Sequence, residues 1–300
     1  MKLEKAVIDE LTVQPGEKAG LDARSTESTT AGWLGSKGTN PKEVAEEELR
    51  LFVDELKASQ ELLWASDTYS LLLVVQGMDA AGKDGTIKHV MSGVNPQGCQ
   101  VVSFKQPSGE ELGHDFLWRY SGALPRRGQI GIFNRSYFEE VLVVRVHPEY
   151  LDPHPTRAPS QPRESLWTDR FEDINAFEHH LYRSGTRIVK VYLHLSREEQ
   201  RRRFLKRLDD PAKNWKFSAA DLAERHLWDE YRVAYEDAIT ATSTEWAPWH
   251  VVPADHKYAL RALVGGILVD TIDRLDLALP GVGSDEAKAL VRARAELLAE

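Results

Sequence analysis

One segment constrains the fold of this chain more than any other, a short apolar run that leads directly into a glycine-rich loop. The run is SLLLVVQ at residues 70–76, and GMDAAGKDG follows at residues 77–85. A continuous apolar run of this length is typical of a strand that is buried on both faces. The spacing G-x-x-x-x-G-K between a strand and a helix is that of a P-loop. The segment therefore predicts phosphate binding at the end of a parallel strand.

The residue types of this loop fit the chemistry of a phosphate group. Glycines let the backbone approach a phosphate without clashes from Cβ atoms, and the loop amides and the next helix N-terminus direct positive dipoles toward it. We expect the Lys83 ammonium to add a full charge on the transferred or leaving phosphate. The predicted phosphate-binding residues of the loop are Gly77, Ala80, Ala81, Gly82, Lys83, Asp84 and Gly85.

Two carboxylates make this loop unusual. Asp84 stands where a serine or threonine normally binds Mg²⁺, and Asp79 adds negative charge beside the phosphate. Both positions are understandable if a metal ion lies between the protein and the phosphate. We predict that Asp79 is the metal-linked carboxylate, with Mg²⁺ as the ion and Mn²⁺ as a substitute. The alternative is that Asp79 shapes the turn and Asp84 caps the following helix.

Strand and helix patterns alternate along most of the chain. Further strand candidates are 100–104, 130–133, 187–193 and 250–252, and helix candidates lie near 41–63, 83–93, 109–120, 136–146, 163–183, 197–208, 219–241 and 257–276. This alternation indicates an α/β fold in which helices cover both faces of a parallel sheet. We predict a P-loop kinase-like fold of this kind with a helical lid.

Composition divides the chain into three parts. Residues 1–42 are rich in Gly, Ser, Thr, Lys and Glu, so we expect an extended arm that wraps the domain or stays mobile. Residues 43–278 are predicted to form the P-loop domain, with the lid near 200–218. Residues 279–300 begin with helix-breaking Pro and Gly residues and are expected to form a tail. The Pro-rich stretch 147–162 is predicted to be a surface loop.

The charge of the chain limits its partners. A net charge of −9 and a pI of about 5.6 argue against a general nucleic-acid binder. Residues 187–232 nevertheless hold twelve Lys and Arg against eight Asp and Glu, so a polyanion can be bound locally. The chain lacks both an apolar stretch long enough to span a membrane and the apolar segment of a secretory signal. We expect a soluble cytoplasmic protein without membrane or nucleic-acid partners.

Basic side chains outside the loop are further candidates for binding phosphate. Lys105 and Arg119 flank the helix predicted near 109–120, a region that faces the acceptor in nucleoside monophosphate kinase-like folds. Arg207 and Lys216 lie in the basic helix and loop of the predicted lid, which would close over phosphates and exclude water. We predict that these four side chains bind the phosphate groups of a polyanion.

The segment after the strand predicted at 130–133 supplies another group of candidates. It lies at the carboxyl edge of the sheet, where open α/β sheets bind ligands, and Arg135 can present a planar fork to phosphate there. The alternative for Arg135 is a structural ion pair with Glu139 or Glu140. Asn134 stands where a Walker B motif places Asp, so Glu139 is the candidate acidic group. We place Asn134 and Glu139 on the nucleotide side of the site.

Together these segments resemble the family 2 polyphosphate kinases. The resemblance covers roughly residues 45–275, and several separated motifs occur in the same order. The matching stretches are GMDAAGKDG (77–85), FKQPSGEELGHDFLWR (104–119), FNRSYFEEVLVVRVH (133–147), RIVKVYLHLSREEQRRRF (187–204), DDPAKNWKFSAADLAERHLWDEYRVAYEDAI (209–239) and APWHVVPADHKYALR (247–261).

The resemblance implies an activity and roles for some residues. It implies a Mg²⁺-dependent, reversible transfer of phosphoryl groups from inorganic polyphosphate to AMP and ADP, which gives ADP and ATP. Asp79, Lys83 and Arg135 would be the catalytic residues. The pattern FNRSxxE, which ends at Glu139, is similar to class III of the family, whose members phosphorylate both AMP and ADP. The resemblance also implies a homo-oligomer, either a dimer or a tetramer.

Three other interpretations stay open at this point. The chain could encode a polyphosphate kinase restricted to one nucleotide, ADP or GDP. It could also encode an ATP-dependent nucleoside monophosphate kinase, although Asp84 after the P-loop lysine favours polyphosphate as donor. A non-catalytic module that senses polyphosphate or nucleotide would bind these ligands without turnover.

Overall fold

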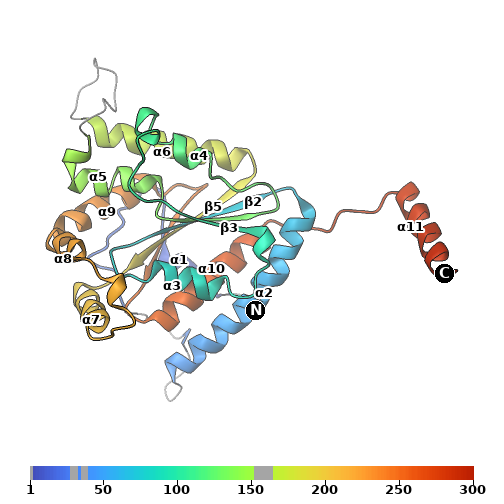
Figure 1. The fold of residues 1–300 in the computed structure, drawn as a ribbon, viewed down its shortest axis with the longest axis horizontal. Coiled ribbons are helices and arrows are strands. Elements are labelled where there is room, and N and C mark those ends of the chain that lie inside the picture. Colours follow the sequence, from blue (N-terminus) through green and yellow to red (C-terminus); the bar gives the residue numbers. More distant parts are fainter. Residues whose placement is uncertain (1–2, 28–32, 35–39, 152–164) are drawn as a thin grey trace.

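A twisted, mostly parallel sheet forms the centre of the computed structural model, which describes residues 3–27, 33–34, 40–151 and 165–300 (Figure 1). Among these residues, six strands pair in the order β1-β6-β5-β2-β4-β3. Only β1 runs antiparallel to its neighbour. The strands are β1 (Thr12–Val13), β2 (Ser70–Gln76), β3 (Cys99–Ser103), β4 (Ile130–Asn134), β5 (Thr186–His194) and β6 (Trp249–Pro253).

Strand β2 shows why this sequence forms a central strand. All seven of its residues are buried, because β5 and β4 flank it and helices cover both faces. Successive side chains alternate between the faces, so Leu71 and Leu73 enter one core while Leu72 and Val74 enter the other. The strands predicted from apolar runs are confirmed to within two residues at each end. Strand β1 was not predicted, because two residues carry no periodic signal.

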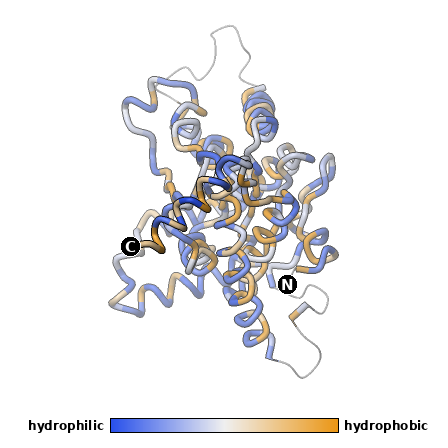
Figure 2. The backbone as a smooth tube through the Cα atoms, turned by 90° about the vertical axis from the view of Figure 1, so that its right-hand side faces the viewer, coloured by the Kyte–Doolittle hydropathy of each residue, from blue (hydrophilic) through white to orange (hydrophobic). Residues whose placement is uncertain are grey.

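Helices cover both faces of the sheet, as the alternating pattern predicted. Helix α10 packs on α2 and α3 on one face, and α6 packs beside α9 and against β5 on the other. Figure 2 shows hydrophobic and hydrophilic residues interspersed along the helical parts of the tube, as expected where one side of a helix is buried. These helices are α2 (Pro41–Ser66), α3 (Lys83–Val90), α6 (Leu166–Arg183), α7 (Arg197–Leu208), α9 (Trp228–Thr242) and α10 (Lys257–Asp273). Helix α11 (Ser284–Leu297) has no buried residue and lies apart from the sheet (Figure 1).

Three predicted helices are shorter or more broken than expected. Only a 3-10 turn (Glu111–Gly113) and the single-turn α4 (Trp118–Ser121) form in the segment 109–120. The segment 136–146 likewise holds a 3-10 turn (Tyr137–Glu140) and the short α5 (Val143–Val146). The helix predicted at 219–241 is divided at Leu227 into α8 (Ala219–His226) and α9. Contacts with residues distant in the sequence determine the backbone of these segments. Helix propensity alone therefore overestimated the helix lengths.

The N-terminal arm lies along the domain over its described part. The prediction of an extended arm is wrong for α1 (Lys5–Leu11), whose Val7, Ile8 and Leu11 are buried in the core. Arg24 then donates hydrogen bonds to the carbonyl oxygens of Ala19, Glu10 and Thr12, which ties the arm together. Residues 28–32 and 35–39 of the arm, and residues 152–164 of the predicted Pro-rich loop, lie outside the described residues.

No helix in the described ranges is both long and apolar enough to cross a membrane.

A buried histidine where the arm meets the sheet makes stability depend on pH. Burial, with a smaller effect of the Arg274 and Lys190 charges, lowers the pKa of His250 to about 4. Its Nδ1 lies 3.1 Å from the Thr12 hydroxyl, which itself donates to the Ile8 carbonyl oxygen, so Nδ1 must be the donor. The folded protein therefore holds His250 neutral over a pH range in which the unfolded chain is protonated.

We expect the free energy of unfolding to fall as the pH drops from about 6.5 toward 4. Over this range the unfolded chain binds a proton that the folded chain does not, which costs at most about 3 kcal/mol. His250→Asn retains a donor for Thr12 but does not titrate, so its loss of stability over the same range should be smaller. Urea unfolding between pH 7.5 and 4.5 measures both slopes, and equal slopes would refute the assignment.

Candidate functional site

The glycine-rich loop has a backbone that glycine and close packing impose. Gly77 and Gly82 have φ values of +157° and +108°, and Ala80 also lies in the left-handed region at +64°. A Cβ atom on Gly77 would lie 3.0 Å from the Cβ atom and 3.1 Å from the carbonyl oxygen of Leu193, so a side chain there would force Leu193 to shift. The loop therefore turns sharply from β2 into the N-terminus of α3, as the motif predicted.

Helix α7 holds the loop from outside. The Arg203 guanidinium donates to the carbonyl oxygens of Ala80 and Ala81 at 2.9 and 2.8 Å, and it also bonds the Ala254 carbonyl oxygen after β6. Gln200 Nε2 donates to the Asp79 carbonyl oxygen at 2.9 Å. These bonds fix the loop backbone against α7 and the end of β6.

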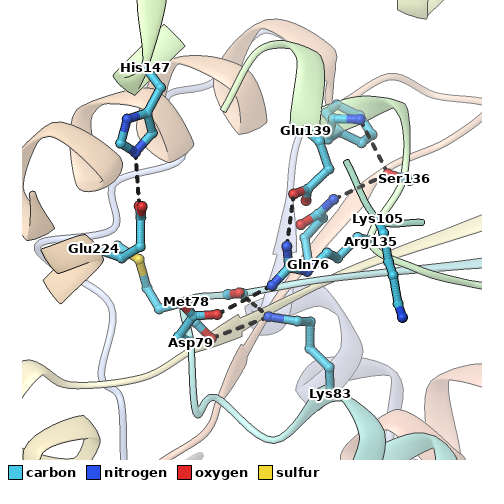
Figure 3. Close-up of polar contacts among 12 residues, drawn as sticks. Gln76, Met78, Asp79, Lys83, Lys105, Arg135, Ser136, Glu139, His147 and Glu224 are labelled. Atoms are coloured by element: carbon cyan, nitrogen blue, oxygen red, sulfur yellow. Dashed lines mark hydrogen bonds and ion pairs between the residues drawn. The ribbon is translucent and has the colours of Figure 1, made fainter. Parts of the chain in front are cut away.

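Lys83, the first residue of α3, folds back over the loop. Its Nζ donates to the Gly77 carbonyl oxygen at 2.5 Å and to that of Met78 at 3.3 Å (Figure 3). Burial lowers the pKa of Lys83, and the nearby Asp79 carboxylate acts in the opposite direction. The ammonium is thus fixed in place beside the loop before any phosphate arrives.

Arg135 lies between two carboxylates opposite the loop. Its guanidinium is 3.5 Å from Asp79 Oδ1 and 3.6 Å from Glu139 Oε2, and its backbone φ is +66°. Burial lowers the pKa of Arg135, but Glu139 and Asp79 outweigh burial and raise it overall. The left-handed backbone at Arg135 directs the chain from β4 into the turn that carries Glu139. The ion pair with Glu139 that the sequence offered as an alternative is present, and it lies within the candidate site.

A hydrogen bond joins Asn134 to Asp84. The Asn134 amide donates to Asp84 Oδ1 at 2.7 Å and to the Ser103 hydroxyl at 3.4 Å. Asp84 lies in the first turn of α3, where a carboxylate also interacts favourably with the helix dipole. This hydrogen bond connects Asp84 to the last residue of β4, which directly precedes Arg135.

The predicted residues line two cavities that meet at the P-loop. One cavity has a volume of about 840 Å³ and the other about 250 Å³. Both are lined by Asp79, Lys83, Arg135 and Asp221. Two ligands, one in each cavity, would therefore meet at the three residues predicted to be catalytic.

The larger cavity is strongly basic. Among the described residues, nine Lys and Arg side chains line it against three Asp. The residues predicted to bind phosphate that line it are Ala80, Gly82, Lys83, Asp84, Gly85, Lys105 and Arg207. The basic side chains are Lys83, Lys105, Arg135, Arg203, Lys206, Arg207, Lys213, Lys257 and Arg261.

The smaller cavity has a different lining. Three aromatic rings, Trp228, Tyr231 and Tyr235, form one side of it, and Glu139 and Glu224 add acidic groups. Burial raises the pKa of Glu139, while Arg135 and Lys83 act in the opposite direction. An apolar wall that faces a charged end suits a ligand with a flat ring at one end and an anion at the other.

Three predicted residues are not placed in either cavity: Ala81, which is fully buried, Arg119 and Lys216. The Arg119 guanidinium is buried, donates to the Lys105 carbonyl oxygen at 2.9 Å and to the Tyr120 hydroxyl at 2.8 Å, and so supports the segment that carries Lys105. Lys216 belongs to the 3-10 turn Asn214–Lys216, but its side chain lies outside the described part of the structure. Asn134 and Glu139, predicted to lie together on the nucleotide side, line different cavities.

Several lining residues escaped the sequence prediction. Lys257 and Arg261 lie one turn apart at the start of α10, which follows β6. Two basic residues at this spacing after a strand could have been recognised in the sequence as candidates for binding phosphate. The aromatic residues Trp228, Tyr231 and Tyr235 gave no signal, because their spacing is equally typical of the buried face of a helix.

Comparisons with known proteins identify the family of this chain. The sequence profile of the family described as Polyphosphate kinase 2 (PPK2) matches residues 39–279. The chain belongs to the polyphosphate kinase 2 family. Within this family, an ADP-polyphosphate phosphotransferase of Rhodopseudomonas palustris is 52% identical over 257 residues, which is 86% of this chain and 89% of that protein.

Two further polyphosphate kinase 2 relatives resemble nearly the whole chain. An AMP/ADP-polyphosphate phosphotransferase of Meiothermus ruber is 46% identical over 239 residues, or 80% of this chain and 85% of that protein. The crystal structure of polyphosphate kinase 2 from Arthrobacter aurescens TC1 superimposes with a TM-score of 0.84 at 39% identity. That match covers 98% of this chain and 99% of the other.

Proposed function

We propose that this protein transfers phosphoryl groups between inorganic polyphosphate and the nucleotides AMP and ADP. One observation carries the proposal: a large basic cavity and a smaller aromatic one share Asp79, Lys83 and Arg135. Polyphosphate is a linear polyanion without an aromatic group, so it fits the cavity with nine cationic side chains. A nucleotide has a flat base and an anionic end, so it fits the smaller cavity.

In this arrangement the protein acts by positioning and charge stabilisation. An oxygen of the nucleotide phosphate attacks the terminal phosphorus of polyphosphate, and the bond from that phosphorus to the rest of the chain breaks. Lys83 and Arg135 lie where the two cavities meet, so they can stabilise charge on the transferred group. The loop amides and the N-terminus of α3 bind the same phosphate region.

The residues at the meeting point suit a Mg²⁺ ion. Proteins commonly bind Mg²⁺ through one or two carboxylates and leave the remaining positions to phosphates and water. The Asp79 carboxylate is 30% exposed and lines both cavities, and its 3.5 Å contact with Arg135 leaves coordination sites free. When bound there, Mg²⁺ would supply positive charge beside the reacting phosphates. Asp79 would hold the ion, and Mn²⁺ would serve as a substitute.

The acceptor range is the finer part of the proposal. The names of two relatives differ, since the protein of Rhodopseudomonas palustris is named for ADP and that of Meiothermus ruber for AMP and ADP. We propose both acceptors, because Asn134 and Glu139 follow the class III pattern and both lie at the site. Because AMP and ADP are cytoplasmic metabolites, we propose a cytoplasmic enzyme, and we retain the proposal of a homo-oligomer.

The test is nucleotide chromatography of a mixture of protein, Mg²⁺, long-chain polyphosphate and AMP without ATP. We expect ADP to appear first and ATP after it, with neither formed when polyphosphate is omitted or EDTA is added. ATP from ADP but no product from AMP would restrict the enzyme to one acceptor. Product formed only with ATP as donor would indicate a nucleoside monophosphate kinase, and binding without turnover a sensing module.

A further inference from the structure

A carboxylate of α8 lies in the wall of the smaller cavity and is fixed by two other elements. Glu224 of α8 lines this cavity. Its Oε2 accepts a hydrogen bond from the Tyr231 hydroxyl of α9 at 2.7 Å and lies 3.0 Å from His147 Nε2 at the end of α5 (Figure 3). Glu224 is thereby held between His147, 77 residues earlier in the chain, and Tyr231, 7 residues later.

The second oxygen of this carboxylate is available to a ligand. Within the described part of the chain, both hydrogen bonds of Glu224 go to Oε2 and none goes to Oε1. The side chain is 31% exposed, and the carboxylate keeps its orientation while Oε2 stays bonded. Such a fixed acceptor can receive hydrogen bonds from a ligand at little cost in side-chain entropy.

His147 is itself held in a single orientation. Its Nδ1 lies 3.0 Å from Glu149 Oε1, so both ring nitrogens face carboxylates. Burial lowers the pKa of His147, but the hydrogen bonds to Glu224 and Glu149 outweigh burial and raise it. The ring stacks near Tyr150 at 5.3 Å between centroids. His147 can therefore orient Glu224 from behind the cavity wall.

The position of Glu224 indicates which part of a nucleotide it meets. A carboxylate repels phosphate, so its partner must be a neutral donor. The aromatic rings Trp228, Tyr231 and Tyr235 offer a surface for the base, while Lys83 and Arg135 mark the phosphate end. Tyr231 lies within electrostatic reach of Asp79 and Glu139, which contribute to its raised pKa after burial and Glu224 itself. A nucleotide with its base on these rings and its phosphate at Lys83 and Arg135 would hold its sugar in the same cavity, in whose wall Glu224 lies.

We propose that Glu224 recognises the acceptor nucleotide by accepting hydrogen bonds from its ribose hydroxyls, and that His147 and Tyr231 are positioning residues for it. Acidic side chains use the same chemistry on the ribose of dinucleotides in other α/β proteins. The proposal rests on the proposed function, because it requires the nucleotide to occupy the smaller cavity. It makes the sugar a determinant of which nucleotides are phosphorylated.

The test compares ADP with 2′,3′-dideoxy-ADP as acceptors, with polyphosphate as donor. For the unmodified protein we expect kcat/KM to be about 10- to 100-fold lower with the dideoxy analogue, as expected for hydrogen bonds to a charged acceptor. Glu224→Ala should lower kcat/KM for ADP and bring the ratio between the two acceptors close to one. Glu230→Ala, which removes an exposed carboxylate from α9 outside both cavities, should keep the ratio.

Two further measurements separate recognition from a general structural effect. His147→Gln should reduce the ratio between ADP and its dideoxy analogue while leaving the KM for polyphosphate unchanged, whereas a purely structural role would leave the ratio intact. Equal use of both acceptors by the unmodified protein, or full discrimination by Glu224→Ala, would overturn the proposal. If Glu224→Ala changed the preference between ADP and GDP but not the ratio between ADP and its dideoxy analogue, the result would overturn the proposal and indicate that Glu224 recognises the base. Failure to form ATP from ADP at all would instead reject the proposed function.

Discussion

Replacement of Lys83 by Met is expected to lower kcat by about 10³-fold or more and to leave the fold intact. The ammonium of Lys83 is fixed by the carbonyl oxygens of Gly77 and Met78, and it lies where the two cavities meet. Its charge is therefore placed beforehand for the transferred phosphate, and no reorganisation is needed during the reaction. Methionine has a similar length but no charge, so the substitution removes the electrostatic contribution and little of the packing.

The measurement is the initial rate of ATP formation from ADP and polyphosphate, together with thermal unfolding of each variant. Lys88→Met is the matched control, because Lys88 lies on the same helix α3 but is exposed and lines neither cavity. We expect that control to retain nearly full activity. Wild-type turnover by Lys83→Met would remove the P-loop lysine from the mechanism, and a large loss of thermal stability would make the kinetic result uninformative about charge.

Replacement of Lys190 by Met is expected to lower the free energy of unfolding by about 3–5 kcal/mol. Lys190 of β5 and Glu178 of α6 are both fully buried, and their ion pair measures 2.6 Å. Lys190 also donates to the Thr242 carbonyl oxygen at 2.6 Å, and Glu178 accepts from the Tyr137 hydroxyl at 2.8 Å. Removing the cation leaves a carboxylate in the core with a single neutral donor.

Urea unfolding of three proteins tests this expectation. The double variant Lys190→Met with Glu178→Gln should regain much of the lost stability, because a neutral amide can still accept from Tyr137 and leaves no buried charge. A loss below about 1 kcal/mol in Lys190→Met would show that the pair contributes little beyond its desolvation cost. Because Tyr137 belongs to the turn that follows Arg135, reduced activity of the single variant at temperatures where it is folded would link the buried pair to the site.

The main elements of the fold could be predicted because their signals are local. The run at β2 is apolar at every position, since a strand between two parallel neighbours has no solvent face. The P-loop followed from its spacing, because glycine is required where a Cβ atom on Gly77 would meet Leu193. The helix α7 begins at the predicted Arg197, since the Ser196 side chain accepts from the Glu199 amide and caps it.

The fate of individual charged side chains could not be predicted in the same way. Arg119 and Lys105 looked alike in the sequence, yet Arg119 is buried beside the Phe104 and Tyr120 rings while Lys105 reaches the larger cavity. A guanidinium can stack on aromatic rings and bond several carbonyl oxygens at once, so its environment depends on neighbours that only the folded chain supplies. The helices predicted near 109–120 and 219–241 were overestimated for the same kind of reason.

The sequence by itself determined the parallel α/β sheet, the phosphate loop and the meeting of Asp79, Lys83 and Arg135 at the sheet edge. Local spacing encodes these features, because strand ends and helix starts are set by nearby residues. Only the tertiary structure decided that two cavities share those residues and that aromatic rings line one of them. It also decided that Glu224 is held by His147 and Tyr231. These features join segments that are far apart in the chain. Their residue types occur both in buried cores and on solvated surfaces, so only the packing of the folded chain determines their environment.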